Sequence, residues 1–323
     1  MAQTIESTNG LAQCGVVLVY CGRMKFPFKI KYISASWGAL VAFVFFTALV
    51  WLLPSHGERE GVEITLTVST FLLAILAGFF MSRLNARYDE MRNLISDQDA
   101  MWLSMYETSE LFGKRFANKM RALIDQYYIV DYDFFLGGYH IGYKESAPVL
   151  EEIWHLVDSV KSKEPQIAVD AMITDLTTIE GLRNALSALS TEKMNLGQWL
   201  IMILLSFVIL LSLYFFGLAG LFFQITSIML ATVLVLILLI MRDLQNFMLG
   251  GHPLMVESGQ EVLEAIGLPR YYHQRFLDAG MVQVPKNIEY RIGSHEPGAD
   301  APDQQIRLVK RSRGKKKVGK KKK

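Results

Sequence analysis

The sequence predicts an all-α membrane protein, with four transmembrane helices in two hairpins and a helical cytoplasmic domain between them. The main observation is that residues 194–241 carry no formal charge and are mostly Leu, Ile, Val and Phe. A bilayer core is about 30 Å thick and needs about 20 apolar residues per helix, so this run is long enough for two crossings. Two more uncharged stretches lie within residues 32–82, and the segment between the hairpins, residues 83–193, is rich in charge.

The first hairpin is expected over residues 32–82. One helix should cover about 33–53, where Pro54 closes the apolar run, because proline is poorly tolerated inside a helix. The other should cover about 64–82, where Arg83 ends the uncharged stretch.

The second hairpin is expected over residues 194–241, with helices at about 196–216 and 221–241. Gly217 and Gly220 lie between them, where a permissive backbone favours a turn. None of the four predicted spans contains Asp, Glu, Lys or Arg. Because membrane-embedded enzymes and proton-coupled transporters need ionisable groups inside their spans, both classes are disfavoured.

The basic residues near the spans indicate the orientation. Cytoplasmic loops carry an excess of Lys and Arg, and here the two short linkers within hairpins hold only Arg59. The basic residues at the other span ends are Arg23, Lys25, Lys29, Lys31, Arg83, Arg87, Arg92, Lys193 and Arg242. Both termini and residues 83–193 are therefore predicted to be cytoplasmic, in a multi-pass protein of the cell (inner or plasma) membrane.

Residues 83–193 are predicted to form the helical domain. From Asn85 to about Gln126 there is no proline, and apolar residues recur in steps of three and four, so the second span should continue as one unbroken helix. The same spacing predicts further helices over Ala147–Ser162 and Ala168–Ser190.

The N-terminal segment, residues 1–31, should be cytoplasmic or interfacial. Its apolar stretch Leu11–Tyr20 has no basic residue before it, so a cleavable signal peptide is not expected. Cys14 and Cys21 are too few for a disulfide framework and fit no zinc-binding spacing, so we interpret them as small apolar residues on one helix face.

The C-terminal segment, residues 242–295, is predicted to contain one helix, Val256–Ile266, and residues 296–323 to be a disordered Lys-rich tail. Residues 307–323 hold eleven basic side chains and no acid, which leaves a net charge of −9 for the rest of the chain. We expect the tail to lie on the anionic inner leaflet or in solvent. Nucleic acid is not an expected partner, because the tail has no interleaved aromatic residues.

No pattern in the sequence predicts catalysis, a metal ion or a cofactor. The six histidines are scattered, and Glu152–His155 matches only one half of the paired E-x-x-H pattern of di-iron bundles. Asp97 and Asp99 have no calcium-loop spacing around them, and Asp131 and Asp133 are isolated in the sequence. P-loop, G-x-S-x-G and G-x-G-x-x-G motifs are absent, so an enzyme is not expected.

The second span and its exit carry the strongest functional signal. Arg83 and Arg87 are four residues apart, so they should share a face at the inner end of the helix, where several copies around an axis would form basic rings that attract anions. Bulky apolar residues above them should form a dewetting constriction. The candidates for this constriction are Leu72, Leu76, Phe79 and Phe80. The alternative is that Arg83 and Arg87 only anchor the helix by reaching the lipid headgroups.

The stretch from Ser82 to Arg92, Ser-Arg-Leu-Asn-Ala-Arg-Tyr-Asp-Glu-Met-Arg, resembles the exit of the pore helix in bestrophin anion channels. The match is closer to the bestrophin-like (DUF4239) bacterial membrane proteins, which share the four-helix layout and an Arg-Asp-Leu exit, here Arg242–Leu244. The resemblance covers about residues 34–268. The residues that match the exit motif are Arg83, Asn85, Tyr88 and Asp89.

The resemblance implies a homo-oligomer, a pentamer, whose second helix lines a chloride-type pore. The Trp-Trp pair that follows Tyr-Asp in bestrophins is replaced by Glu90-Met91, and no acidic calcium clasp is visible, so calcium gating is not expected. The expected partners are further copies of the chain, anions such as chloride, and the lipid bilayer. The alternative function is a non-conducting membrane scaffold or sensor whose cytoplasmic helices bind a partner.

Overall fold

The chain divides into two units, Met1–Lys31 and Tyr32–Lys323, and the computed structural model describes residues of the second. The described residues are 35–52, 59–134, 139–160, 166–216, 221–249, 252–254, 257–282, 284–285, 288–299 and 301–310. The predictions for Leu11–Tyr20, Cys14 and Cys21 concern residues outside these stretches.

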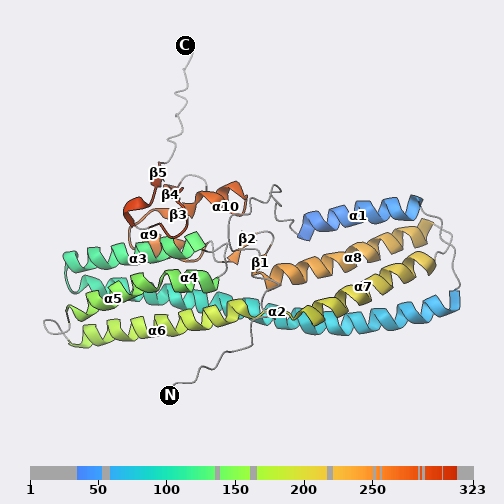
Figure 1. Ribbon diagram of the computed structural model, residues 1–323, viewed down its shortest axis with the longest axis horizontal. Helices are drawn as coiled ribbons and strands as arrows, with labels where there is room; N and C mark the ends of the chain where they lie inside the picture. Colours follow the sequence, from blue (N-terminus) through green and yellow to red (C-terminus); the bar gives the residue numbers. More distant parts are fainter. Residues whose placement is uncertain are drawn as a thin grey trace, which may run out of the picture. The chain divides into compact units, whose positions relative to one another are not determined.

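Four apolar helices pack together as the span bundle (Figure 1). They are α1 (Ala35–Leu52), the N-terminal half of α2 (Arg59–Glu110), α7 (Leu196–Phe216) and α8 (Leu221–Gln245). Among the described residues, α2, α7 and α8 are long and apolar enough to cross a membrane, whereas α1 contributes only a shorter apolar stretch, Trp37–Leu49. The fold is thus that of a membrane protein, and the fourth crossing, by α1, stays a prediction.

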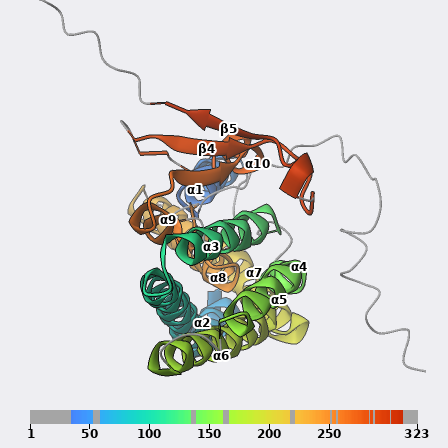
Figure 2. The ribbon, with the colours of Figure 1, turned by 90° about the vertical axis from the view of Figure 1, so that its left-hand side faces the viewer.

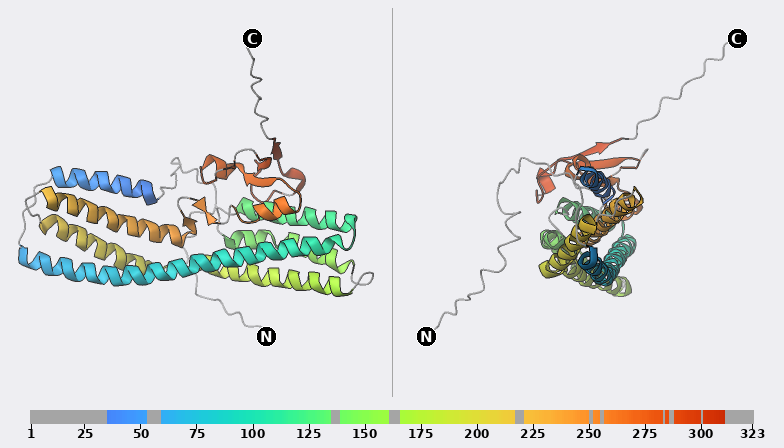
Figure 3. Two further views of the ribbon diagram at one scale, coloured as in Figure 1. Left: turned by 180° about the vertical axis from the view of Figure 1, so that it is seen from behind. Right: turned by 90° about the vertical axis from the view of Figure 1, so that its right-hand side faces the viewer.

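The helices of the span bundle do not pack as two separate hairpins. α1 lies along α8 and α2 lies along α7, so each helix of the first predicted pair packs on a helix of the second (Figures 1 and 3). The close approach of α1 to α8 favours Gly38, because a Cβ there would overlap the end of the Leu239 side chain unless that side chain moved. One cluster of buried apolar residues in the bundle consists of Leu73, Ala77, Phe80, Leu84, Met202, Ile209, Leu213, Leu234, Met241 and Leu244.

α2 continues out of the span bundle as one helix of 52 residues and ends at Glu110. The prediction of one unbroken helix to about Gln126 is wrong after Glu110. Residues 111–113 form a turn, and a new helix, α3 (Lys114–Phe134), follows it. The physical reason is Gly113, whose φ of 90° is a left-handed backbone conformation that commonly ends helices.

The charged helical domain consists of the C-terminal half of α2 with α3, α4 (Tyr139–Glu145), α5 (Ala147–Asp158) and α6 (Gln166–Thr191). Figure 2 shows these helices nearly end-on. α6 and α3 both pack on α2, and the Trp102 and Tyr127 rings meet in the core with their centroids 4.7 Å apart. The predicted helix Ala168–Ser190 agrees with α6 to within two residues, whereas the predicted helix Ala147–Ser162 ends earlier, at Asp158.

A small sheet follows the last apolar helix, so the all-α prediction is wrong for this part of the chain. β3 (Arg270–His273) pairs in parallel with β4 (Tyr290–Gly293), and β4 pairs antiparallel with β5 (Ile306–Val309). Aromatic and β-branched residues favour strands, and these strands are only four residues long, which is too short for a clear alternating pattern. α10 (Gln274–Asp278) follows β3 and buries Phe276 in an apolar cluster with Tyr272 and Val282.

Short elements lead into this sheet. β1 (Met248–Leu249) and β2 (His252–Pro253) pair antiparallel, and α9 (Gln260–Ala265) comes next. α9 is shorter than the predicted Val256–Ile266, because its N-cap, Gly259, has a φ of 70° and a Cβ there would overlap the ring of Tyr128. We call the described residues 257–310 the C-terminal module.

The predicted disordered tail is wrong as far as Lys310. A short 3₁₀ helix, η4 (Ala301–Asp303), precedes β5, and β5 pairs with β4 from Ile306 to Val309. Ile306 is also partly buried against the apolar cluster that the charged helical domain shares with α9 and β3, so this segment has an apolar contact that composition alone does not reveal. Residues 311–323, the most basic part of the tail, lie outside the described stretches.

Candidate functional site on helix α2

The apolar half of α2 has one buried and one exposed face. Buried residues recur every three or four positions, as expected for one side of a helix with about 3.6 residues per turn. They are Ser69, Leu73, Ala77, Phe80, Leu84, Arg87 and Met91. On the opposite side Phe71, Ile75 and Phe79 follow one another at four-residue steps and are 66%, 53% and 63% exposed. The exposed face of α2 is therefore an apolar row that the rest of the described chain does not cover.

The predicted constriction residues divide between the two faces. Leu72 and Phe79 are exposed, whereas Phe80 is buried in the span bundle and Leu76 packs partly against the same cluster. Ile75 belongs to the exposed row and was missed by the sequence reasoning. The sequence offers no signal for it, because the helix is apolar all round here and no polar residue marks the exposed side.

Small residues form a second row beside the bulky one. Ala74, Gly78, Ser82 and Ala86 are spaced by four and are all exposed. A Cβ at Gly78 would meet nothing within 4 Å, so no part of the described chain occupies the space beside it. Small residues at this spacing allow close approach of another helix in a membrane.

Arg83 and Arg87, which the sequence predicts on one face of the helix, differ in exposure. Arg83 is exposed, but Arg87 is only 7% exposed. The Arg87 guanidinium donates hydrogen bonds to the backbone carbonyls of Leu189, Ser190 and Gln245. Arg87 is held by the protein itself, which leaves Arg83 as the exposed cation of this pair.

The other exit-motif residues have different surroundings. Asn85 and Asp89 are exposed, whereas Tyr88 is partly buried and packs between the span bundle and a second apolar cluster around Met91. At the end of α8, Asp243 is buried and pairs with Arg242 at 2.7 Å. The motif therefore combines packing residues with exposed polar ones.

Asp99 joins α2 to the start of α9. Its carboxylate accepts hydrogen bonds from the Tyr128 hydroxyl at 2.8 Å, the Ser258 hydroxyl at 3.0 Å and the backbone N–H of Gly259 at 2.9 Å. Asp97 is exposed and takes no part in this joint. Because three donors already occupy the Asp99 oxygens, the carboxylate acts as a structural acceptor.

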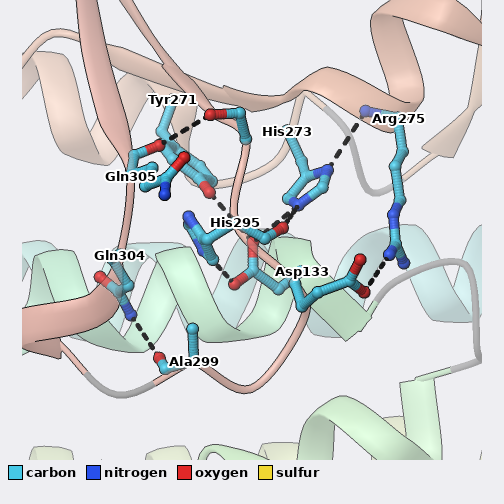
Figure 4. Close-up of polar contacts among 10 residues, drawn as sticks. Asp133, Tyr271, His273, Arg275, His295, Ala299, Gln304 and Gln305 are labelled. Atoms are coloured by element: carbon cyan, nitrogen blue, oxygen red, sulfur yellow. Dashed lines mark hydrogen bonds and ion pairs between the residues drawn. The ribbon is translucent and has the colours of Figure 1, made fainter.

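A second buried polar network joins α3 to the C-terminal module (Figure 4). The Asp133 carboxylate accepts hydrogen bonds from the Tyr271 hydroxyl at 3.0 Å and from Nε2 of His295 at 2.7 Å. Nε2 of His273 lies 2.9 Å from the carbonyl oxygen of His295. Burial raises the pKa of Asp133 and lowers the pKa of His273. Asp133 is therefore not isolated in the fold, although its partner His295 is 162 residues away in the sequence.

Asp133, His273 and His295 are residue types that hold metal ions, and their ligand atoms lie within 4.8 Å of one another. The hydrogen bonds favour a different interpretation. Nδ1 of His273 accepts from the backbone N–H of Arg275 at 3.2 Å, so in the neutral ring the proton is on Nε2, which donates to the His295 carbonyl. His273 then has no lone pair for a metal, and we interpret the cluster as a hydrogen-bonded joint.

Known structures resemble this fold. A bacterial bestrophin homologue from Klebsiella pneumoniae superposes with a TM-score of 0.52 at 13% identity, covering 72% of this chain and 96% of that one. A variant of the homologue gives a TM-score of 0.51 at 14% identity with the same coverage. At such low identity the likeness shows the fold alone. A search of curated proteins finds no match.

A family model described as the Bestrophin-like domain matches residues 33–245. The match begins just before α1 and ends with α8, so it contains the whole span bundle and the charged helical domain, while the C-terminal module lies beyond it. Because the model matches more than half of the sequence, and the fold agrees, the chain belongs to the bestrophin-like family.

Proposed function

We propose that this protein is a homo-oligomeric, chloride-type anion channel whose pore is lined by the exposed face of α2. The observation that carries the proposal is the pair of faces on that helix. Phe71, Ile75 and Phe79 are exposed in a row, while the residues behind them are packed into the span bundle. Membership of the bestrophin-like family supports the same function.

Copies of α2 around a common axis would bring their apolar rows together as rings. A narrow apolar segment controls ion passage because water leaves it when the rings approach and returns when they separate. The row of small residues from Ala74 to Ala86 lets neighbouring α2 helices come close enough to form such rings. Arg83, exposed just beyond them, would raise the local concentration of anions at the inner mouth.

In this proposal the assembly is a pentamer, and both termini and the charged helical domain are cytoplasmic. The orientation follows from the basic residues at the inner ends of the spans. The Lys-rich residues after Lys310 would then lie near the anionic inner leaflet, where each positive charge contributes about 1 kcal/mol of attraction. Native mass spectrometry in mild detergent gives the subunit number directly.

Chloride flux from liposomes that contain the purified protein tests the proposal. Phe79→Ala removes a ring of bulky side chains from the constriction, so it should raise the flux severalfold. The matched control is Phe222→Ala. Phe222 is also an exposed phenylalanine of the span bundle, at 85%, but it lies on α8, which does not line the proposed pore. Equal fluxes for both variants and the wild type would contradict the proposal that α2 lines the pore.

The selectivity of the current tests the anion part separately. Arg83→Gln should lower the permeability of chloride relative to sodium, which reversal potentials in a salt gradient measure. Asp89 and Asp97 are also exposed on α2. If the wild-type channel prefers cations, the proposed channel function stands and the proposed anion selectivity is wrong.

A non-conducting scaffold or sensor is the alternative. It predicts no flux in any variant and an assembly of one or two subunits, which cannot surround an axial pathway. The feature that favours it is a groove of the charged helical domain, lined by Tyr143, Trp154, Glu180, Arg183 and Asn184. Pull-down of a partner that Trp154→Ala abolishes, together with absent flux, would establish this function instead.

A further inference from the structure

Arg87 connects three helices at the inner end of the span bundle. Its Nε donates to the carbonyl of Leu189 at 3.1 Å, and one terminal nitrogen donates to the carbonyl of Ser190 at 3.4 Å, both in the last turn of α6. The other terminal nitrogen donates to the carbonyl of Gln245 at 2.9 Å, the last residue of α8. One side chain of α2 therefore caps the ends of α6 and α8 together.

The ends of these two helices are a natural place for a cation. The last carbonyls of a helix have no acceptor role within the helix, and they carry a partial negative charge of about half an electron in total. The guanidinium also lies over the Phe247 ring at 4.0 Å, and Trp199 of α7 donates to the side chain of Gln245 at 2.8 Å. This junction of α2, α6, α7 and α8 is mostly buried, so its charge is poorly screened by water.

We propose that Arg87 is a positioning residue for the pore: it ties α2 to the ends of α6 and α8, so that movement of the charged helical domain reaches the exposed face of α2. The electrical consequence rests on the proposed channel function, whereas the tie itself does not. The apolar row ends at Phe79, about two turns before Arg87, so a rotation of α2 at the junction would turn the whole row.

The three acceptors come from two helices, and this selects arginine over lysine. Guanidinium presents Nε and both terminal nitrogens in one rigid plane, so it can reach all three carbonyls at once. A lysine ammonium is a point charge at the end of a flexible stem. Arg87→Lys keeps the charge and should lose part of the tie, and Arg87→Gln should lose nearly all of it. Arg92→Gln is the matched control, because Arg92 is an exposed arginine of the same helix.

Hydrogen exchange on the full chain in detergent measures the tie. Backbone amides in residues 186–191 and 242–247 should exchange about tenfold faster in Arg87→Gln, less so in Arg87→Lys, and at the wild-type rate in Arg92→Gln. Amides of α5 serve as an internal reference. Wild-type exchange at both helix ends in Arg87→Lys and Arg87→Gln would overturn the proposal. Equally faster exchange throughout the chain in the conservative Arg87→Lys would also overturn it, because Arg87 would then support the whole fold and not a local tie.

Single-channel recording separates positioning from mere support of the fold. In Arg87→Lys the open fraction should change severalfold, while the unitary current and the ion selectivity stay at wild-type values. A variant with fewer channels but an unchanged open fraction would show that Arg87 only stabilises the fold. If the wild type carries no current, the channel function fails, and the exchange experiment still decides whether Arg87 ties the three helices.

Discussion

Two carboxylates of α3, Asp125 and Asp133, hold the sheet of the C-terminal module. Asp125 binds the Arg291 guanidinium of β4 through two hydrogen bonds of 2.6 Å, and Asp133 accepts from Tyr271 of β3 and from His295. Hydrogen bonds to charged groups contribute about 1.5–3 kcal/mol each, more than neutral ones. These few contacts determine where a sheet of short strands lies on the helices.

Asp133→Asn should lower the free energy of unfolding by about 1–3 kcal/mol. An amide keeps one acceptor oxygen but turns its NH₂ group toward one of two donors, the Tyr271 hydroxyl or Nε2 of His295. Chemical unfolding of the full chain in detergent measures the loss. The control is Glu296→Gln, whose carboxylate pairs with Arg275 but is 89% exposed, so its effect should stay within about 0.5 kcal/mol. Equal effects for the two variants would contradict the assignment of Asp133 as a joint.

Asp131 makes the stability depend on pH. Burial raises its pKa from 3.8 to about 7, although the nearby Arg183 guanidinium opposes the rise. The folded state then binds the proton more tightly than the unfolded state, so this group stabilises the fold at low pH and loses that contribution as pH rises from about 4 to 7. Asp131→Asn removes the dependence, and its stability relative to the wild type should rise by about 1.4 kcal/mol or more between pH 5 and pH 8. A difference that stays constant with pH in chemical unfolding would refute this.

At the scale of elements, the turn between α2 and α3 fixes the length of the longest helix. Gly113 adopts a φ of 90°, and a Cβ there would meet nothing within 4 Å. Glycine is therefore required at this position because of its backbone conformation, and not because a side chain would clash with a neighbour. The turn lets α3 pack back along α2, which brings Asp125 and Asp133 to the C-terminal module.

Gly113→Ala should destabilise the protein by about 1 kcal/mol, because an alanine is strained at this backbone conformation. Gly181→Ala is the matched control: Gly181 lies inside α6, is exposed, and has open space around a Cβ. There alanine should stabilise the helix by up to about 1 kcal/mol. Thermal unfolding of the two variants should thus shift in opposite directions, and a shared direction would contradict the role of the turn.

The positions of the helices are largely predictable from the sequence, because apolar periodicity and the absence of charge mark them directly. The predicted span 196–216 coincides with α7, and the predicted span 221–241 begins with α8. The turn at Gly113 is not predictable, since a single glycine inside a helical pattern does not reveal its φ. The sheet is not predictable either, because its strands are held by partners such as Asp125 and Asp133 that are distant in the sequence.

In the candidate site, too, some features are predictable from the sequence and others are not. Sequence reasoning identifies α2 and its exit as the region of interest, yet it does not resolve which face is exposed. Phe79 and Phe80 are neighbours with opposite burial, and Arg83 and Arg87 differ in the same way. Only the contacts of α2 with α6, α7 and α8 distinguish them, and the hydrogen-bond partners of Arg87 lie more than 100 positions away in the sequence.

At the scale of the whole molecule, the C-terminal module lies outside the matched family domain but is tied to the charged helical domain by buried contacts. Its last strand, β5, is an edge strand that pairs with β4 along its whole length. A chain that stops after Lys310 keeps β5, and a chain that stops after Asp303 loses it.

Truncation after Lys310 should therefore leave the melting temperature and the subunit number unchanged. Truncation after Asp303 should lower the melting temperature by about 2–4 °C for each kcal/mol that the strand contributes. Differential scanning fluorimetry and native mass spectrometry of the two truncated chains measure these outcomes. A loss of assembly on removing only residues 311–323 would show that the basic segment holds subunits together.

The packing of α1 on α8 constrains how the chain can be made. α1 ends at Leu52 and α8 begins at Leu221, so about 170 residues must leave the ribosome before the two can meet. At 5–20 residues per second, translation of that interval takes roughly 10–35 s. During that time the side of α1 that carries Gly38 has no α8 to pack against, so something else must cover this apolar surface.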